Sequence, residues 1–131
     1  MKLKFLAGAG LASYNIQDGV IEGVNTESFV EGSKFLGNEE TKAAGIFDMF
    51  WRDGVKHVVL AQPTKTTDIP WAAREGEWID ANDYDPLQRY VVATNPRALA
   101  LLASGEAEYW RDPEDGAWTV RCIDTEQEPT P

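Results

Sequence analysis

The most clearly marked element of the sequence is a helix within residues 94–105. Residues 98–103 are all alanine or leucine, which are strong helix formers. Asn95 can cap the first turn through its side-chain oxygen, Pro96 suits the first helical position, and Gly105 favours the left-handed backbone that ends a helix. We expect this helix to lie across a sheet and to bury its leucine face there.

Apolar patterning predicts strands at several places. Residues 2–6 alternate Lys with Leu and Phe, which is typical of a strand with one buried face. Residues 55–61 are apolar on both faces at their centre, which predicts a central strand that Pro63 ends. Shorter strands are predicted at 78–81 and 89–93.

A β-hairpin is predicted around Asp18-Gly19, because this dipeptide readily takes the positive φ values of a type I′ turn. Its second arm continues through Gly23 and Val24 to a polar cap. A weak helical pattern then covers residues 27–36, although Gly32 and Ser33 interrupt it.

A second helix is predicted to begin after Asn38. Two carboxylates follow this cap, where the positive end of the helix dipole favours them. Apolar residues then recur at helical spacing, namely Ala43, Ile46, Phe47, Phe50 and Trp51. The pair Asp53-Gly54 is expected to stop this helix.

The last predicted element is a β-hairpin with arms at 106–112 and 117–124. The favoured register places Glu108 opposite Arg121, where opposite charges attract. A shift by one residue would turn Glu108 inward and bury its charge. The inward face then gathers Ala107, Tyr109, Trp118, Val120 and Cys122. Trp110 lies on the outer face.

The loop at residues 63–77 has no periodicity, and a loop of this length inside a compact domain is uncommon unless it carries function. It is therefore the first place to look for a binding site. Trp71, Arg74 and Trp78 would act as anchors there, because Trp and Arg are enriched at binding hot spots. In the other interpretation, which we favour, the Trp71 side chain is buried and packs the loop against the core, and Trp78 belongs to the next strand.

The acidic run from Asp80 to Pro86 has oxygen-bearing side chains at alternating positions, as a calcium loop does. The calcium pattern fails, because the fifth position is Tyr84, the sixth is Asp85 instead of Gly, and the twelfth is Val91 instead of Glu. A solvated turn between two strands explains the same residues, so we expect no metal there.

The chain has 131 residues, 43% of them hydrophobic, which suits one domain with one core. We predict a single α+β domain over residues 1–124, followed by a flexible C-terminal tail at 125–131. The expected architecture is an antiparallel or mixed sheet of about six strands with two or three helices packed on one face.

The formal charge of −10 disfavours direct binding to nucleic acid or to an anionic membrane and favours a protein partner with a basic surface. The single cysteine fits a reducing compartment, so the expected location is the cytoplasm. Residues 1–13 have the basic start and small residues of an export signal, but glycines dilute their apolar part. No run approaches the roughly 18 apolar residues of a transmembrane helix.

Candidate catalytic groups are few. His57 is the only histidine and falls in a predicted buried strand, and Cys122 is expected on an inward face, so neither is a convincing base or nucleophile. A zinc site needs more Cys and His ligands, and no glycine-rich phosphate-binding motif occurs. We therefore predict no catalytic residue, metal or cofactor, although enzyme activity is not excluded.

The leading hypothesis is a non-enzymatic binding module, such as an inhibitor, an immunity-type protein or a phage or mobile-element accessory protein. Its surface would combine aromatic and acidic side chains. The predicted binding residues are Trp71, Arg74, Trp78, Asp80, Asp83, Tyr84, Asp85 and Trp110. One alternative is a structural subunit of a homo-oligomeric assembly such as a virion, with Trp110 buried between copies. Another is a small-molecule-binding protein or enzyme with a pocket under the 63–77 loop.

Overall fold

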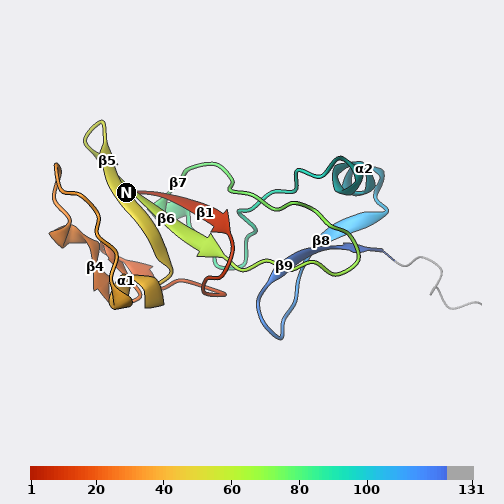
Figure 1. The fold of residues 1–131 in the computed structure, drawn as a ribbon, viewed down its shortest axis with the longest axis horizontal. Coiled ribbons are helices and arrows are strands. Elements are labelled where there is room, and N and C mark those ends of the chain that lie inside the picture. Colours follow the sequence, from red (N-terminus) through yellow and green to blue (C-terminus); the bar gives the residue numbers. More distant parts are fainter. Residues whose placement is uncertain (124–131) are drawn as a thin grey trace, which may run out of the picture.

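The computed structural model describes residues 1–123 and has mixed sheets with few helices, an α+β arrangement. Figure 1 shows an elongated molecule with a four-stranded sheet in one half and a two-stranded hairpin beside α2 in the other. The strands are β1 (Lys2–Ala7), β2 (Ile16–Gln17), β3 (Val20–Ile21), β4 (Val24–Asn25), β5 (Ile46–Arg52), β6 (Val55–Gln62), β7 (Ile79–Asp80), β8 (Ala107–Arg111) and β9 (Trp118–Cys122). The helices are α1 (Glu39–Ala43) and α2 (Pro96–Ser104), with 3-10 turns η1 (Thr26–Ser28) and η2 (Ala81–Asp83).

The predicted single sheet of about six strands, with its helices on one face, is not the arrangement found. The described residues form nine strands in three sheets, ordered β5-β6-β1-β7, β2-β3-β4 and β8-β9. The two helices also separate, because α1 packs on β5 and α2 packs on β8. One cluster of buried side chains nevertheless joins the halves, from Leu3 and Val58 in the large sheet through Trp71 to Val120 in the hairpin.

The centre of the large sheet agrees with the sequence. In β1, Leu3 and Phe5 are buried while the alternating lysines are partly exposed. The strand β6 lies between β5 and β1, runs parallel to β1 and ends at Gln62, just before Pro63. The predicted central position of residues 55–61 is therefore confirmed.

The predicted helix over residues 38–51 is wrong beyond its first turns. Asn38 caps α1 as expected, since its side chain accepts from Thr41 N, but α1 ends at Ala43. The chain then enters β5, and Asp53 and Gly54, with φ of 52° and 73°, join β5 to β6 as a tight hairpin. The pair that was expected to stop a helix is thus a hairpin turn, and cross-strand pairing overrides the helical spacing of 46–51.

The N-terminal hairpin at Asp18-Gly19 is confirmed, with φ of 51° and 76° at the two turn residues. A second turn at Glu22-Gly23 adds a third short strand, β4. The predicted helix over 27–36 is wrong, because only the 3-10 turn η1 forms, capped by Asn25.

The predicted strand over 89–93 is also wrong, since only Val92 pairs, in an isolated bridge with Arg74. The reason is that the side-chain oxygen Oε1 of Gln62 accepts hydrogen bonds from the backbone N–H groups of Tyr90 and Val91. These donors are satisfied without a neighbouring strand.

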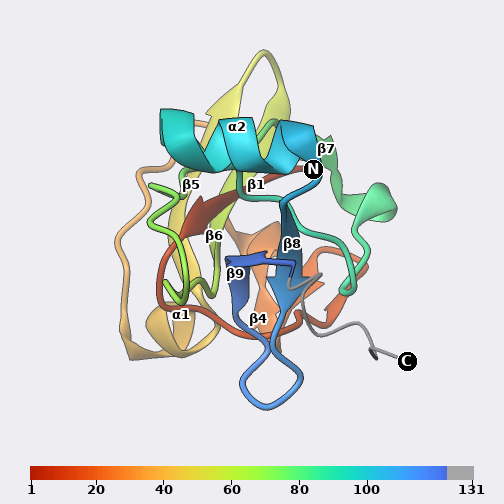
Figure 2. The same cartoon turned by 90° about the vertical axis from the view of Figure 1, so that its right-hand side faces the viewer.

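The helix α2 has the predicted caps: the Asn95 side chain accepts from the first turn, and Gly105 takes φ of 81°. Figure 2 shows α2 lying across one end of the β8-β9 hairpin. Its leucine face is only partly buried, because Leu101 and Leu102 pack on the core while Leu99 is 45% exposed.

Neither α2 nor the shorter α1, the α-helices of residues 1–123, is long enough to cross a lipid bilayer.

The predicted register of the C-terminal hairpin is confirmed, including Glu108 opposite Arg121 and Tyr109 opposite Val120. The side chains of the first pair are joined at 2.8 Å between Arg121 Nη2 and Glu108 Oε1. The inward position of Cys122 is wrong: its side chain is exposed, because it ends β9 at the margin of the core. Residue 124 and the predicted tail at 125–131 lie outside the described residues.

Candidate functional site

The long loop packs onto the core through Trp71. This side chain is 2% exposed, its Nε1 donates to Lys65 O at 3.0 Å, and its ring meets that of Tyr109 edge-on at 5.8 Å. The neighbouring Arg74 is exposed, and its backbone pairs with Val92. Trp71 therefore anchors the loop, as the favoured interpretation predicts, and its ring is not presented to a partner.

Trp110 lies on the outer face of the hairpin but is only half exposed. The guanidinium carbon of Arg121 is 4.3 Å from the centroid of its ring, and the same arginine pairs with Glu108. A cation of the same hairpin thus covers part of the indole.

The acidic turn divides its side chains between core and solvent. Asp80 caps η2 by accepting from Asn82 N at 3.0 Å. Tyr84 turns inward, where it stacks on Phe5 with ring centroids 5.5 Å apart, and burial raises the pKa of its hydroxyl. Asp83 and Asp85 remain exposed.

A cavity of about 640 Å³ lies between this turn and the β2-β3 turn. Three carboxylates line it, those of Asp18, Glu27 and Asp80, together with Asn82. We call these four residues the acidic groove. Sequence reasoning found Asp80 but missed Asp18 and Glu27, because only the folding of the N-terminal turn against η2 brings them near it.

One basic side chain, Lys56, also lines the cavity, and Asp80 lies 4.0 Å from Lys2 Nζ. Lys56 is 7% exposed and its Nζ donates to Thr26 O at 2.9 Å. Burial lowers the pKa of this amine. Across residues 1–123, no group of three or more His, Cys, Asp and Glu side chains has the geometry to hold a metal ion. The groove is therefore suited to attracting cationic groups by charge.

A second surface is the face of the large sheet opposite Leu3 and Phe5. The strand register places Phe50, His57, Lys2 and Asp80 in one row across β5, β6, β1 and β7. Asp48, Val59 and Lys4 form the next row, with Trp78 beside it and Arg52 beyond the first row. We call these nine residues the open sheet face.

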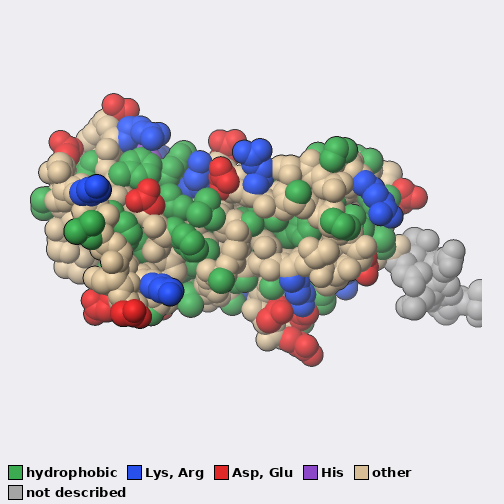
Figure 3. Space-filling view, viewed as in Figure 1, with side chains coloured by type: hydrophobic (Ala, Val, Ile, Leu, Met, Phe, Trp, Pro, Cys, Tyr) green, Lys and Arg blue, Asp and Glu red, His purple; other side chains and the backbone are tan. Residues whose placement is uncertain are grey.

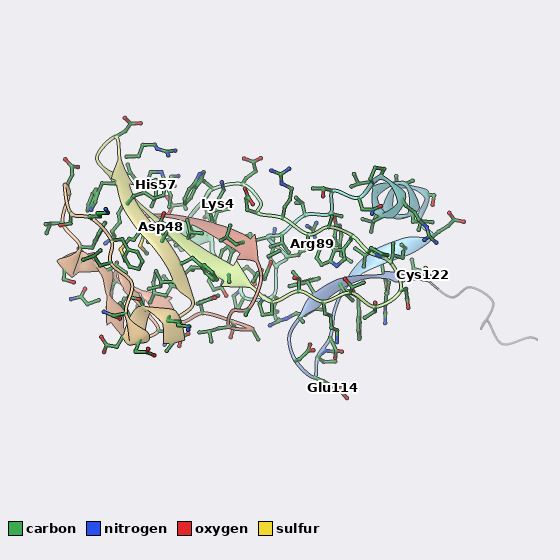
Figure 4. The ribbon with its side chains drawn as sticks, in the orientation of Figure 1. Lys4, Asp48, His57, Arg89, Glu114 and Cys122 are labelled. Atoms are coloured by element: carbon green, nitrogen blue, oxygen red, sulfur yellow. The ribbon has the colours of Figure 1, made fainter. Side chains whose placement is uncertain are left out.

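Aromatic rings and cations interleave on the open sheet face. Phe50 and His57 stack with centroids 5.2 Å apart, and Trp78 meets His57 edge-on at 4.8 Å. Lys4 Nζ is 5.1 Å from the Trp78 ring centroid, and the Arg52 guanidinium is 5.0 Å from that of Phe50. Figure 4 labels Lys4, Asp48 and His57 close together over this sheet, and Figure 3 shows hydrophobic side chains in this half of the molecule bordered by charged ones.

Sequence reasoning assigned Trp78 and Asp80 to binding but placed Phe50 and His57 in the core. The missed signal was Asp53-Gly54, since a two-residue hairpin turn there predicts that Phe50 and His57 face each other.

His57 and Cys122 do not form a catalytic pair. His57 Nδ1 is 2.9 Å from Val55 O, and its ring is engaged by two aromatic neighbours. Figure 4 places His57 and Cys122 at opposite ends of the molecule.

A second hollow, of about 1020 Å³, is lined by Phe35, Ile46 and Phe47 beside α1. Phe47 sits at a β-bulge of β5 and is 54% exposed, and nearby Leu36 is 77% exposed. We call this the apolar groove.

Together these features describe a small α+β module whose distinctive surfaces are grooves and a sheet face. No family model, curated protein or solved structure matches this chain.

Proposed function

We propose that the chain is a non-enzymatic protein-binding module of the inhibitor, immunity or phage-accessory kind. It binds basic side chains of a partner in the acidic groove. The observation that carries the proposal is the convergence of Asp18, Glu27 and Asp80 on one cavity whose lining cation, Lys56, is bound to a backbone carbonyl. Lys or Arg side chains of a partner supply the charge that the groove lacks.

The rest of the molecule supports the same partner chemistry. The chain carries 22 acidic residues against 12 basic ones, so its field accelerates encounter with a basic surface. Asp83 and Asp85 are exposed and follow the groove residue Asn82, and Trp78 lies two residues before Asp80. Of the predicted surface, these residues and Tyr84 remain in the proposal, while Trp71, Arg74 and Trp110 do not take part.

The test compares two variants with the same change in net charge. Asp18→Asn, Asp80→Asn and Asp83→Asn together remove two of the three carboxylates of the groove and one carboxylate of its rim, while keeping side chains that suit the turn and the cap. Glu31→Gln, Glu40→Gln and Glu114→Gln neutralise exposed carboxylates elsewhere. The probe is a fluorescein-labelled nine-residue peptide of alternating Lys and Gly, titrated by anisotropy in 0.1 M salt.

We expect the groove variant to bind the lysine peptide about tenfold more weakly than the wild type, because each exposed pair contributes about 0.2–1 kcal/mol. The second variant should stay within about twofold. Equal weakening by both variants would mean that only net charge matters, and the proposed site would be rejected.

A structural subunit of an assembly is the second candidate, and the apolar groove favours it. Exposed Phe47 and Leu36 beside a large hollow are what a contact between copies requires. Light scattering at micromolar concentration decides this: a defined oligomer supports the assembly, and a monomer opposes it.

The small-molecule hypothesis has less support, because Ile69 and Trp71 of the 63–77 loop fill the space beneath it. A thermal-shift screen against nucleotides, sugars and metals tests it. We also propose a cytoplasmic location, which the free and exposed thiol of Cys122 supports.

A further inference from the structure

Within the described part of the chain, two of the three cations of the open sheet face, Lys4 and Arg52, lack carboxylate partners. Among the ion pairs of residues 1–123, none includes Lys4 or Arg52, and Lys2 lies only at 4.0 Å from Asp80. By contrast, Lys65 and Arg121 are paired at short range. In a chain with 22 acidic residues and 12 basic ones, three cations on one face without close pairing form a local reversal of charge.

Two of these cations are also held in place. Lys4 lies against the ring of Trp78 and Arg52 against that of Phe50, and the rings pack on His57 between them. A side chain that is ordered before binding loses less conformational entropy when a ligand arrives. The face therefore offers preorganised positive charge around an aromatic centre.

The spacing of the face matches an extended peptide. Lys2 and Lys4 are two residues apart on β1, which corresponds to about 6.6 Å along a strand. Alternate side chains of an extended segment have the same separation, so carboxylates at positions i and i+2 reach both lysines. Phe50 and Val59 lie in the same two rows on the neighbouring strands β5 and β6, so an apolar side chain of the segment meets them where the segment crosses from β1 toward Arg52.

We propose that the open sheet face binds a short extended acidic segment of a protein partner, with carboxylates on Lys2, Lys4 and Arg52 and an apolar side chain on the aromatic centre. This inference rests on the proposed function only in taking the chain as a protein-binding module. It uses a surface that shares only Asp80 with the acidic groove, and it has the opposite charge preference.

A single-stranded nucleic acid is the competing occupant, and two observations disfavour it. Asp48 and Asp80 stand in the same rows as the cations and would lie close to a continuous phosphate backbone. The net charge of −10 also repels a long polyanion, whereas a short segment responds mainly to charges within a Debye length of about 10 Å.

The experiment titrates three fluorescein-labelled probes by anisotropy: a nine-residue peptide with Glu at positions 2, 4 and 8, Leu at position 6 and Gly elsewhere (the Glu-Leu peptide), whose Glu and Leu side chains share one face when extended, the same peptide with Lys for Glu, and a nine-nucleotide oligothymidylate. The face variant combines Lys4→Gln and Arg52→Gln. The matched control combines Lys34→Gln and Lys42→Gln, two exposed cations outside the face. Circular dichroism confirms that each variant is folded.

We expect the Glu-Leu peptide to bind the wild type, the face variant to bind it about tenfold more weakly, and the control to change by less than about twofold. The groove variant described above should bind it no more weakly than the wild type, so the two proposals fail independently. Equal losses in face variant and control, tighter binding of the oligothymidylate, or no saturable binding of the Glu-Leu peptide below about 1 mM would each overturn the inference.

Discussion

Substitution of Trp71 tests whether the long loop has a structural role or a binding role. The side chain is 2% exposed, and burying a Trp removes about 150–250 Å² from water. At about 25 cal/mol per Å² this burial contributes about 4–6 kcal/mol, an upper value that agrees with the roughly 3–5 kcal/mol lost in large-to-Ala substitutions. Trp71→Ala should therefore remove a large part of a stability that is typically about 5–15 kcal/mol.

Urea unfolding followed by circular dichroism measures the loss. Trp71→Phe is the matched control, because it keeps most of the ring but loses the bond from Nε1 to Lys65 O, and it should cost about 1–2 kcal/mol. A loss below about 1 kcal/mol for Trp71→Ala would show that the loop does not depend on this anchor. Unchanged stability combined with lost partner binding would instead restore Trp71 as a binding residue.

Three further predictions concern caps, turns and pH. Asn95→Ala should lower the free energy of unfolding by about 1 kcal/mol because it removes the α2 cap, whereas Asn95→Asp should preserve it; urea titration distinguishes them, and equal losses would contradict the capping role. Gly45→Ala should destabilise the protein by more than the roughly 1–2 kcal/mol expected for a left-handed residue, because the added methyl group would also strike the hydroxyl of Tyr14. Gly23→Ala is the control, since its methyl group meets no neighbour and only the backbone cost remains. Similar melting temperatures for the two variants would refute this. The hydrogen bond from Lys65 holds the pKa of the Asp112 carboxyl below its usual range, so this pair contributes stability above the unfolded pKa of about 3.9 that is lost as pH falls through the lower folded value. Lys65→Met should flatten the fall in unfolding free energy between about pH 5 and 2, and an unchanged pH profile would count against the pair.

The elements that could be read from the sequence are those with local signals. The helix α2 is specified by a cap, a proline and a terminal glycine that lie next to the residues they act on. The β8-β9 register follows from placing one charged pair outward and one apolar set inward, and a two-residue period leaves little choice. Local chemistry of this kind does not depend on where the rest of the chain lies.

The misread segments are those in which strand pairing or a side-chain contact overrides the local pattern. Residues 46–51 fit both a helical and a strand period, and pairing with β6 decides for the strand. Residues 90 and 91 have the composition of a strand, but the side chain of Gln62 takes their backbone donors. Only the second segment depends on a group far along the chain, since Gln62 is 28 residues away from Tyr90, whereas the partner of residues 46–51 lies just across the two-residue turn at Asp53-Gly54.

The candidate surfaces divide in the same way. The amino-acid sequence by itself determined the acidic character of the chain, the acidic turn at Asp80 and the aromatic residue Trp78 beside it. Only the tertiary structure buried Trp71, brought Asp18 across to Asp80 and set the cations of β1 among the rings of β5 and β6. The physical reason is that charge and side-chain type are properties of single residues, whereas a groove or a face forms only when folding brings together residues that are far apart in the sequence.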